Sequence, residues 1–510
     1  MEHKQAYIEV IRNDPKKMSL DFQVFLFSSL PLLLAILLLK LYFSSSKSHI
    51  NLPPSPPKLP LIGNLHQLGS GTHRVLQSMA QTYGPLMLLH FGTVPVVVAS
   101  SVDAARDIMK THDIIFSNRP FLNIANRLFY NSKDIAFAKY GEYWRQVKSI
   151  SVLQLLSNKR VKSYRQVRED EVAHMIKKIQ GANESVVNLS ELLISLTNNV
   201  ISRVALGRTY EGMGVNYKNI PVRIGAMLGR FSIGSYIPWL AWVDRLTGLH
   251  READQLAKEI DEFYEGVIEE HVNKKVVDVE GQDLVDILLE LQRDNSTSFL
   301  LERYTVKAII MDVFGAGTDT IFASLEWAIS ELLRNPHTMK ELQQEARKIG
   351  QGRLMIPEDD IEKMPYLKAV LKEALRLHVP APLLVPREST KEVKLLGYDI
   401  PAHTQVMINA WAIARDPSIW EEPEEFRPER FLNIRTDYKG FDFELIPFGA
   451  GRRMCPGISF AETIIELALA NLAYKFEFTL PSEDGLDMTE SDGITIHRKF
   501  PILVIPTPCE

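Results

Sequence analysis

The sequence predicts a mainly α-helical protein with a minor β-sheet region, preceded by a single N-terminal transmembrane helix. Three observations support this. A long apolar run lies near the start, and short β-rich runs are few, namely Leu86–Phe91, Val94–Ala99, Val393–Leu396 and Thr404–Asn409. Apolar residues recur at helical spacing in longer stretches: Arg168–Gln180, Leu189–Leu206, His250–Lys274, Tyr304–Arg334 and His337–Ile349.

The apolar run at residues 22–43 is predicted to be a signal-anchor helix, after an N-terminal extension at residues 1–21. As a helix it would span roughly 33 Å, close to the thickness of a bilayer's hydrocarbon core. A cleaved signal peptide is the alternative, but no small-x-small cleavage site follows. Between Lys40 and Val102 the charged residues are all basic, which predicts a cytoplasmic side. Translation from Met18 is a second possible start.

Residues 44–62 are predicted to form a proline-rich hinge, because closely spaced prolines favour a stiff, extended chain. A plain spacer is the alternative. Residues 63–510 are predicted to form one catalytic domain, with a hairpin turn at Gly92-Thr93 and a helix stop at Asn335-Pro336.

Composition narrows the function. The net charge of -5, without a basic patch, gives no reason to expect nucleic acid as a partner. The chain has two cysteines, Cys455 and Cys509, so a disulfide framework is not expected. Cys509 lies next to the end of the sequence, which leaves Cys455 as the candidate working cysteine.

The segment Pro447–Gly457 reads P-F-G-A-G-R-R-M-C-P-G. A thiolate needs nearby N–H groups and positive charge, and Cys455 lies just before a predicted helix, whose N-terminus favours an anion. Gly449 and Gly457 allow the backbone to approach closely, and Phe448 would shield the sulfur from water. The alternative is a glycine-rich surface turn with an inert cysteine.

This loop contains F-x-x-G-x-R-x-C-x-G in full and resembles the haem-binding signature of the cytochrome P-450 superfamily. The resemblance extends from the anchor to Thr507, and the stretch Pro382–Glu388 is similar to the plant A-type microsomal branch. It implies a haem b between a long central helix and the cysteine loop. Cys455 would be the axial thiolate ligand, and Arg453 would meet a haem propionate.

Two further motifs fit this family. The resemblance implies a buried structural triad of Glu373, Arg376 and Arg430, although Glu373 and Arg376 alone would fit an ordinary surface ion pair. The segment Gly315–Thr320 lies in the middle of a predicted helix and resembles the family's oxygen motif. It assigns Thr320 and Asp319 to catalysis and places Ala316 and Gly317 against the haem; by itself it fits a helix-packing groove equally well.

The remaining haem contacts follow the family pattern less closely. The family commonly has W-x-x-x-R, whereas this chain has Trp144 with Lys148, which keeps the charge without the planar guanidinium. Arg145 is a possible substitute, and Arg387 is also carried over as haem-binding. The substrate pocket carried over by position consists of Ile124, Leu128, Phe129, Ile309, Asp312, Val313, Ala316, Leu383, Leu384, Ile494 and Ile496. Asp312 either orients a polar substrate group or is satisfied by neighbours.

The resemblance implies a monooxygenase of the endoplasmic reticulum membrane that uses O₂ and electrons from NADPH through a separate reductase. The mostly apolar pocket favours a small lipophilic plant metabolite, such as a terpenoid, coumarin or alkaloid. A basic cluster for reductase docking is expected at Arg145, Lys148, Lys159, Arg160, Lys162 and Arg165, with a solvated helix face as the alternative. The alternatives in function are a hydroperoxide lyase or isomerase of the same fold and a non-catalytic haem-binding membrane protein.

Overall fold

The computed structural model describes residues 29, 31, 33–36, 51–182, 185–210, 219–273, 282–294, 299–482 and 485–509. The chain forms two units, Met1–Asn51 and Leu52–Glu510. In the first unit residues 29, 31 and 33–36 are helical, and the side chains of Leu33, Leu34 and Ile36 are exposed. Most of the predicted transmembrane helix at residues 22–43 lies outside the described residues.

The β structure of the second unit is small. The strands are β1 (Leu86–Phe91), β2 (Val94–Ala99), β3 (Val187–Asn188), β4 (Arg387–Glu388), β5 (Val393–Leu395), β6 (Tyr398–Ile400), β7 (Gln405–Ile408), β8 (Phe476–Thr479) and β9 (Leu503–Pro508). They form sheets in the orders β1-β2-β7-β4, β3-β9-β8 and β5-β6. The predicted hairpin is present, with Phe91 paired to Val94 across Gly92-Thr93. The two later predicted strands belong to different sheets, which only the tertiary pairing decides.

Helices make up most of the second unit. Before the central helix come α3 (Thr72–Tyr83), α4 (Val102–Arg106), α5 (Asn123–Leu128), α6 (Glu142–Ile150), α7 (Asn158–Ser163), α8 (Arg165–Gln180), α9 (Leu189–Leu206), α10 (Ile220–Gly229), α11 (Ile233–Tyr236), α12 (Ala241–Leu246), α13 (Leu249–Asn273) and α14 (Leu284–Arg293). After it come α17 (Pro336–Gly350), α18 (Glu358–Ile361), α19 (Pro365–Leu377), α20 (Ala410–Ile413) and α21 (Ile458–Lys475). Short helical turns are η1 (Leu65–Gln67), η2 (Asp107–Thr111), η3 (Ser151–Leu155), η5 (Pro238–Leu240), η8 (Pro428–Phe431) and η9 (Gly451–Arg453).

The central helix is less regular than its sequence predicts. It consists of α15 (Arg303–Met311), a widened π-helical turn η7 (Asp312–Ala316) and α16 (Gly317–Arg334). The widened turn contains Gly315 and is followed directly by Gly317, and glycines weaken a regular helix. Its last two residues are the first two of the motif assigned to oxygen activation, and such turns are frequent at functional sites. The helix ends at Asn335, as the Asn-Pro pair predicts.

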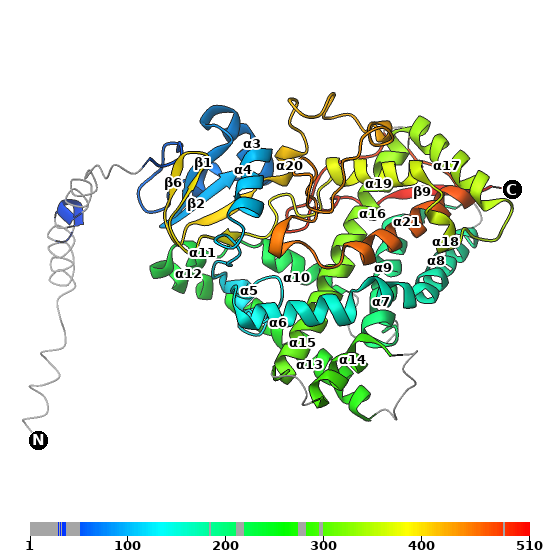
Figure 1. The fold of residues 1–510 in the computed structure, drawn as a ribbon, viewed down its shortest axis with the longest axis horizontal. Coiled ribbons are helices and arrows are strands. Elements are labelled where there is room, and N and C mark those ends of the chain that lie inside the picture. Colours follow the sequence, from blue (N-terminus) through cyan, green and yellow to red (C-terminus); the bar gives the residue numbers. More distant parts are fainter. Residues whose placement is uncertain are drawn as a thin grey trace, which may run out of the picture. The chain divides into compact units, whose positions relative to one another are not determined.

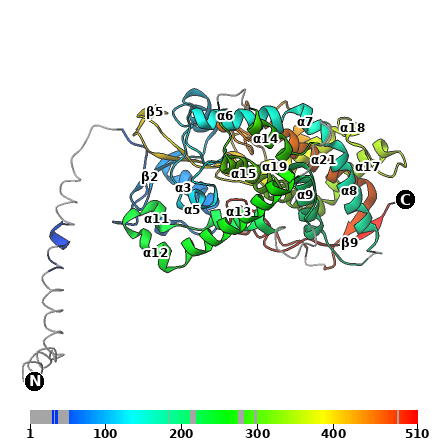
Figure 2. The ribbon, with the colours of Figure 1, turned by 90° about the horizontal axis from the view of Figure 1, so that it is seen from below.

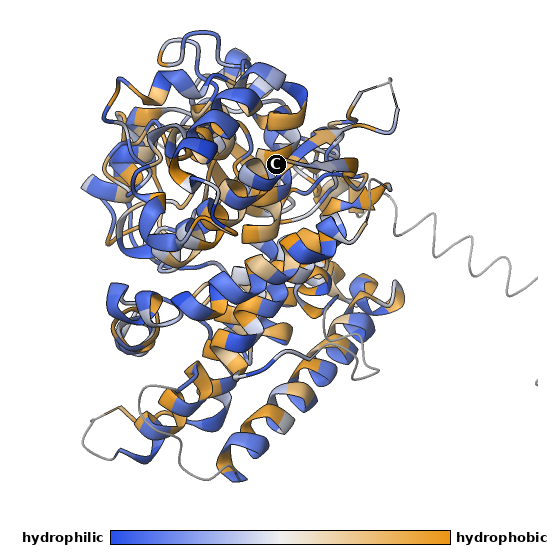
Figure 3. Cartoon of the chain, turned by 90° about the vertical axis from the view of Figure 1, so that its right-hand side faces the viewer, coloured by the Kyte–Doolittle hydropathy of each residue, from blue (hydrophilic) through white to orange (hydrophobic). Residues whose placement is uncertain are grey.

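Figure 1 shows β1, β2 and β6 toward one end of the second unit, α8 and α17 toward the other, and α16 between them. Figure 2 shows β2 and β5 at that same strand-containing end, with α8 and α17 at the opposite end. α16 contacts α9, α10, α17, α19 and α21, and these contacts build the main hydrophobic core. The long helices carry hydrophobic and hydrophilic faces (Figure 3). Within the described ranges, residues 303–334 are long and apolar enough to cross a bilayer, but 72% of their most apolar window is buried. This stretch is therefore the core helix of the protein.

Candidate active site

The loop that carries Cys455 lies between η9 and α21 and is closed by its own backbone. The N–H of Cys455 donates to the carbonyl of Phe448 at 3.0 Å, and the N–H of Gly457 donates to the Cys455 sulfur at 3.4 Å. The surrounding protein desolvates the Cys455 thiol and so raises its pKa, although the residue is exposed at its loop, while the Gly457 N–H and the charge of Lys148 act to lower the pKa. The sulfur therefore has one donor and one nearby cation for a negative charge.

Two glycines in this loop have a backbone that other residues rarely adopt. Gly449 has φ +68° and Gly451 has φ +69°. A Cβ at Gly451 would lie 2.3 Å from the carbonyl oxygen of Met109 and 2.7 Å from Asp113 Oδ1. Asp113 accepts from the backbone N–H of Arg452 at 3.1 Å and from its guanidinium at 2.9 Å. The loop thus depends on a close approach to η2 that only glycine permits at position 451.

α6 reaches the same loop through Lys148. Its ammonium donates to the carbonyls of Arg452 at 2.5 Å and Met454 at 3.1 Å, and burial lowers its pKa to about 8. Lys148 is therefore bound to the backbone beside Cys455. Arg145, the possible substitute, is exposed, with its guanidinium 5.8 Å from the Tyr140 ring.

Three buried arginines surround the start of this loop. Arg453 donates to the carbonyls of Ser117, Ile135 and Ala138 at 2.6 to 3.0 Å, and its guanidinium lies 4.1 Å from the Trp144 ring. Arg387 donates to the carbonyl of Ala450 at 2.9 Å.

Arg119, which the sequence analysis missed, is the third buried arginine and donates to the carbonyls of Ala136, Val385 and Pro386. In the sequence, no spacing or motif distinguishes Arg119 from an arginine on the protein surface. Burial, and then the charges of Arg453 and Arg387, hold the pKa of Arg119 well below its usual value.

The cluster of Arg119, Arg387 and Arg453 has few carboxylates to balance it. Asp113 is one, and it also pairs with Arg452. Asp134 is the other: burial raises its pKa to about 7, and its Oδ1 has no hydrogen bond within the described part of the chain. A buried excess of positive charge is costly unless an anion meets it. The cluster therefore suits a ligand that carries carboxylates.

The small-residue motif of the central helix contains a solvent-accessible residue, as the Cys455 loop does. Ala316 is exposed although it lies halfway along the core helix, and Cys455 is exposed at its loop. The Thr320 hydroxyl donates to the carbonyl of Ala316 at 2.7 Å, and Gly317 packs against Ile201. Asp319 is buried, and its Oδ1 lies 3.0 Å from His497 Nε2. Sequence reasoning did not single out His497, because it lies far along the chain from any motif.

The structure brings together the three residues assigned to the structural triad. Glu373 accepts from Arg376 at 2.8 and 2.9 Å and from Arg430 at 3.0 Å. The other donors of Arg376 meet the carbonyls of Ala414, Pro423 and Glu425. Glu373 and Arg376 are fully buried, so this contact firmly ties α19 to η8 and the chain that precedes it.

Most of the residues assigned to the pocket are buried and apolar. Ile124, Leu128, Phe129, Ile309 and Val313 belong to the main core, and Leu383, Leu384 and Ile494 are partly buried.

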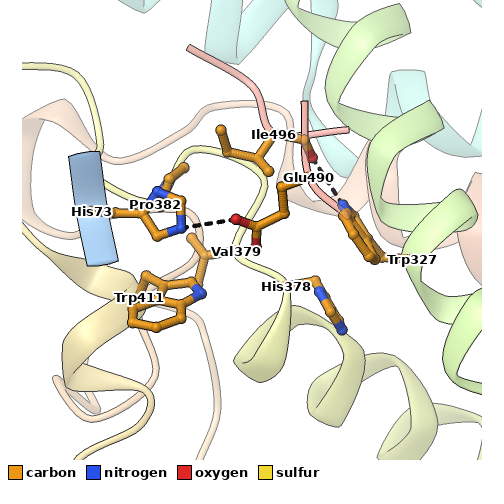
Figure 4. A pocket seen from close by; sticks show the side chains of 8 residues that line it. All are labelled: His73, Trp327, His378, Val379, Pro382, Trp411, Glu490 and Ile496. Carbon is orange, nitrogen blue, oxygen red and sulfur yellow. Dashed lines mark hydrogen bonds and ion pairs between the residues drawn. The ribbon is translucent and has the colours of Figure 1, made fainter. Parts of the chain in front are cut away.

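Two pocket assignments have other contacts. Asp312 accepts from the backbone N–H of Ile135 at 2.6 Å, and burial, with the nearby Asp134, raises its pKa well above the usual value. Ile496 lines a cavity of about 10 Å³, room for roughly one water (Figure 4). That cavity is also lined by His73, Trp327, His378, Val379, Pro382, Trp411 and Glu490.

Comparison with known proteins identifies the family. The family model described as Cytochrome P-450 matches residues 53–504. The chain belongs to the cytochrome P-450 family. It is 57% identical to cytochrome P-450 71A2 of Solanum melongena, over 92% of this chain and 95% of the relative. It is 53% identical to norfluorocurarine oxidase of a Strychnos species, over 94% and 97% of the two chains.

A solved structure agrees with this identification. A zebrafish cytochrome P-450 with abiraterone superposes with a TM-score of 0.74 at 26% identity, covering 86% of this chain and 99% of that one. The protein is therefore a cytochrome P-450 monooxygenase with the mainly helical P-450 fold and a haem-thiolate cofactor. The residues present fit that cofactor, because a sulfur with an N–H donor lies beside a buried arginine cluster suited to two propionates.

The glycine at 451 gives a direct test of the loop geometry. We expect Gly451→Ala to lower the free energy of unfolding by about 3 kcal/mol, since both the backbone strain and the clash with Met109 act. Gly352→Ala is the matched control: Gly352 has φ +75° but no neighbour within 4 Å, so we expect a loss of about 1 kcal/mol. Denaturant unfolding of both variants measures the difference, and equal losses would contradict the close approach.

Proposed function

We propose that Cys455 supplies the thiolate of the haem and that residues 63–510 form the catalytic domain of a plant specialised-metabolism monooxygenase. The single observation that carries this is the Cys455 loop, with its sulfur beside the Gly457 N–H and next to a buried arginine cluster. The naming of plant relatives as norfluorocurarine oxidase and 3-beta-hydroxylase (the latter in Tanacetum parthenium, 53% identical) supports a small lipophilic substrate.

The roles of the chain's own residues follow from their contacts. Arg119, Arg387 and Arg453 would hold the two propionates, and Trp144 would support Arg453. The half-buried Phe448, whose ring lies 5.4 Å from that of Tyr438, would keep water from the Cys455 sulfur. When bound, haem supplies the oxygen-activating chemistry.

The residues of the central helix would control protons and substrate. Thr320 would hold a proton at its Oγ1 beside the exposed Ala316, and Asp319 would supply protons from its carboxyl group. The apolar side chains of α5 and α15, with Val313, would exclude water and orient a lipophilic substrate. The triad of Glu373, Arg376 and Arg430 would keep the chain behind the loop in place.

Replacing the cysteine tests the proposed ligand. We expect Cys455→Ser to abolish the red-shifted Soret band that reduced, carbon-monoxide-bound haem shows with a thiolate ligand. Cys509→Ser is the matched control and should keep the band, because Cys509 lies beside Arg347 at the C-terminal strand. Absorption spectra of the full chain in microsomes give the measurement. A thiolate band in the Cys455 variant would refute the assignment.

We propose that electrons arrive from NADPH through a separate reductase that docks beside α6 and α7. Lys148 links α6 to the Cys455 loop, and this contact supports a docking face near the proposed haem ligand. Lys159 and Lys162 on α7 are exposed, whereas Arg165 pairs with Asp359 and Glu169. The available positive charge is therefore centred on α7.

Charge reversal on α7 tests the docking face. We expect the double variant Lys159→Glu, Arg160→Glu to slow reduction of the haem by about tenfold at low salt, since electrostatic steering raises association rates by 10-fold or more. The difference should shrink as salt is added. Lys258→Glu, on the exposed face of α13, is the control. Stopped-flow reduction with NADPH and reductase measures the rates, and equal rates in the two variants would exclude this face.

We propose that residues 22–43 anchor the protein in the endoplasmic reticulum membrane, with the catalytic domain on the cytosolic side. An exposed apolar surface supports membrane contact by the domain. It comprises Leu59, Leu61, Ile62, Phe231, Trp239, Trp242 and Leu246. Hydrogen bonds from Gly92 to Ile62 and from Thr93 to Tyr236 hold its two parts together. Exposed tryptophans next to aliphatic side chains are typical of membrane–water interfaces.

Tryptophan fluorescence tests this contact. In the full chain reconstituted with brominated lipid, we expect the double variant Trp239→Phe, Trp242→Phe to lose most of the lipid-dependent quenching. The reason is that these two side chains are 56% and 55% exposed on the proposed membrane face. Trp420→Phe is the control, because Trp420 is buried and should leave quenching unchanged. Undiminished quenching in the double variant would place the membrane elsewhere.

A further inference from the structure

The carboxylate of Asp319 has an imidazole partner that no motif contains. His497 Nε2 lies 3.0 Å from Asp319 Oδ1, and the His497 ring stacks on Phe322 with centroids 5.3 Å apart and planes at 25°. Gly225 of α10 faces the other carboxylate oxygen, since a Cβ there would lie 3.0 Å from Asp319 Oδ2. Three segments that are distant in sequence therefore converge on one carboxylate.

The loop that carries His497 is held firmly against α16. Trp327 Nε1 donates to the carbonyl of Ile496 at 2.9 Å (Figure 4), and Arg498 donates to the Ser330 hydroxyl at 2.9 Å. The backbone N–H of Arg498 donates to Glu326 at 3.2 Å. Because both neighbours of His497 are tied to α16, the imidazole position is determined by the fold.

The second nitrogen of this imidazole is unusual. His497 Nδ1 is buried and has no hydrogen bond to any residue that the structure describes. A buried polar atom without a partner is costly, and such atoms often mark catalytic groups or bound water. The side chain as a whole is 17% exposed, compared with 6% for Asp319. The imidazole thus lies between the buried carboxylate and solvent.

We propose that His497 is a positioning residue for the monooxygenase reaction: it orients the Asp319 carboxylate and resupplies it with protons. This inference rests on the proposed role of Asp319. In the transfer, a hydronium ion passes its proton through a water bound at the buried Nδ1 and leaves as water. The Nδ1–H bond forms, the Nε2–H bond breaks, and an O–H bond forms on Asp319 Oδ1. The ring returns to its first tautomer by exchange with water, so one proton enters for each one delivered.

The charges around the imidazole give the transfer a pH dependence. Burial lowers the pKa of His497, but the hydrogen bond and charge of Asp319, then the charge of Glu326, raise it more, so the net shift is upward. Arg498 is the neighbouring cation, and its charge acts to lower the pKa of Glu326. A raised pKa means that the ion pair is present below the ordinary pKa of histidine and is lost as pH rises through the raised value. Proton supply should therefore fall over that interval.

Two substitutions separate the parts of this proposal. His497→Gln can keep a hydrogen bond to Asp319 but has no titrating group, and His497→Phe keeps the ring stacking alone. His271→Gln is the matched control, because His271 forms a similar buried pair with Asp283 at 2.8 Å in another part of the protein. The full chain in microsomes with reductase is assayed for NADPH-dependent O₂ consumption and for its solvent isotope effect across pH.

We expect His497→Phe to slow O₂ consumption about tenfold and to raise the solvent isotope effect, as proton transfer becomes limiting. His497→Gln should lose the fall in rate with rising pH, whereas wild type and His271→Gln keep it. If both His497 variants match the control in isotope effect and pH profile, the proposal is overturned although the proposed function stands. A wild-type chain without a thiolate band or NADPH-dependent O₂ use would overturn both.

Discussion

A buried guanidinium is stabilised when its N–H groups find acceptors, and this constraint holds the loops around Arg453 and Arg376 in place. Arg453 binds the carbonyls of Ser117, Ile135 and Ala138, and Arg376 binds those of Ala414, Pro423 and Glu425 beside the Glu373 carboxylate. Breaking any one of these contacts would leave a desolvated donor, which costs more than an ordinary hydrogen bond. The loop segments that supply these carbonyls therefore have defined positions although they have no regular secondary structure.

The arginine constraint also prepares the haem site. The charges of Arg119, Arg387 and Arg453 repel one another, and burial lowers the pKa of Arg453 to about 9 and that of Arg387 to about 10. In the function proposed above, the propionates of the haem would supply the anion that relieves this repulsion. Folding and cofactor binding would then be energetically coupled through the same side chains.

The proposed catalytic role and the structural role of the central helix meet on α16. Its start carries small residues and directly follows the widened turn at 312–316, and further along it Glu326, Trp327 and Ser330 bind the C-terminal loop. A helix can serve both purposes because its faces are separate, so contacts made on one side leave the other open. The widened turn reduces local helix regularity, and the tight packing of the rest of α16 in the core compensates for it.

The sequence by itself determined what local patterns encode. Helical periodicity predicted both the first and the last residue of α9. The β-rich runs predicted the β1–β2 hairpin, and the loop with Cys455 indicated the cofactor. Only the tertiary structure decided which polar groups meet: Arg119 joins the arginine cluster, Lys148 binds loop carbonyls, and Asp319 pairs with His497. These partners lie up to hundreds of residues apart. The partners of buried polar groups are decided by which donors and acceptors come together on folding. The spacing of residues along the chain does not indicate those contacts.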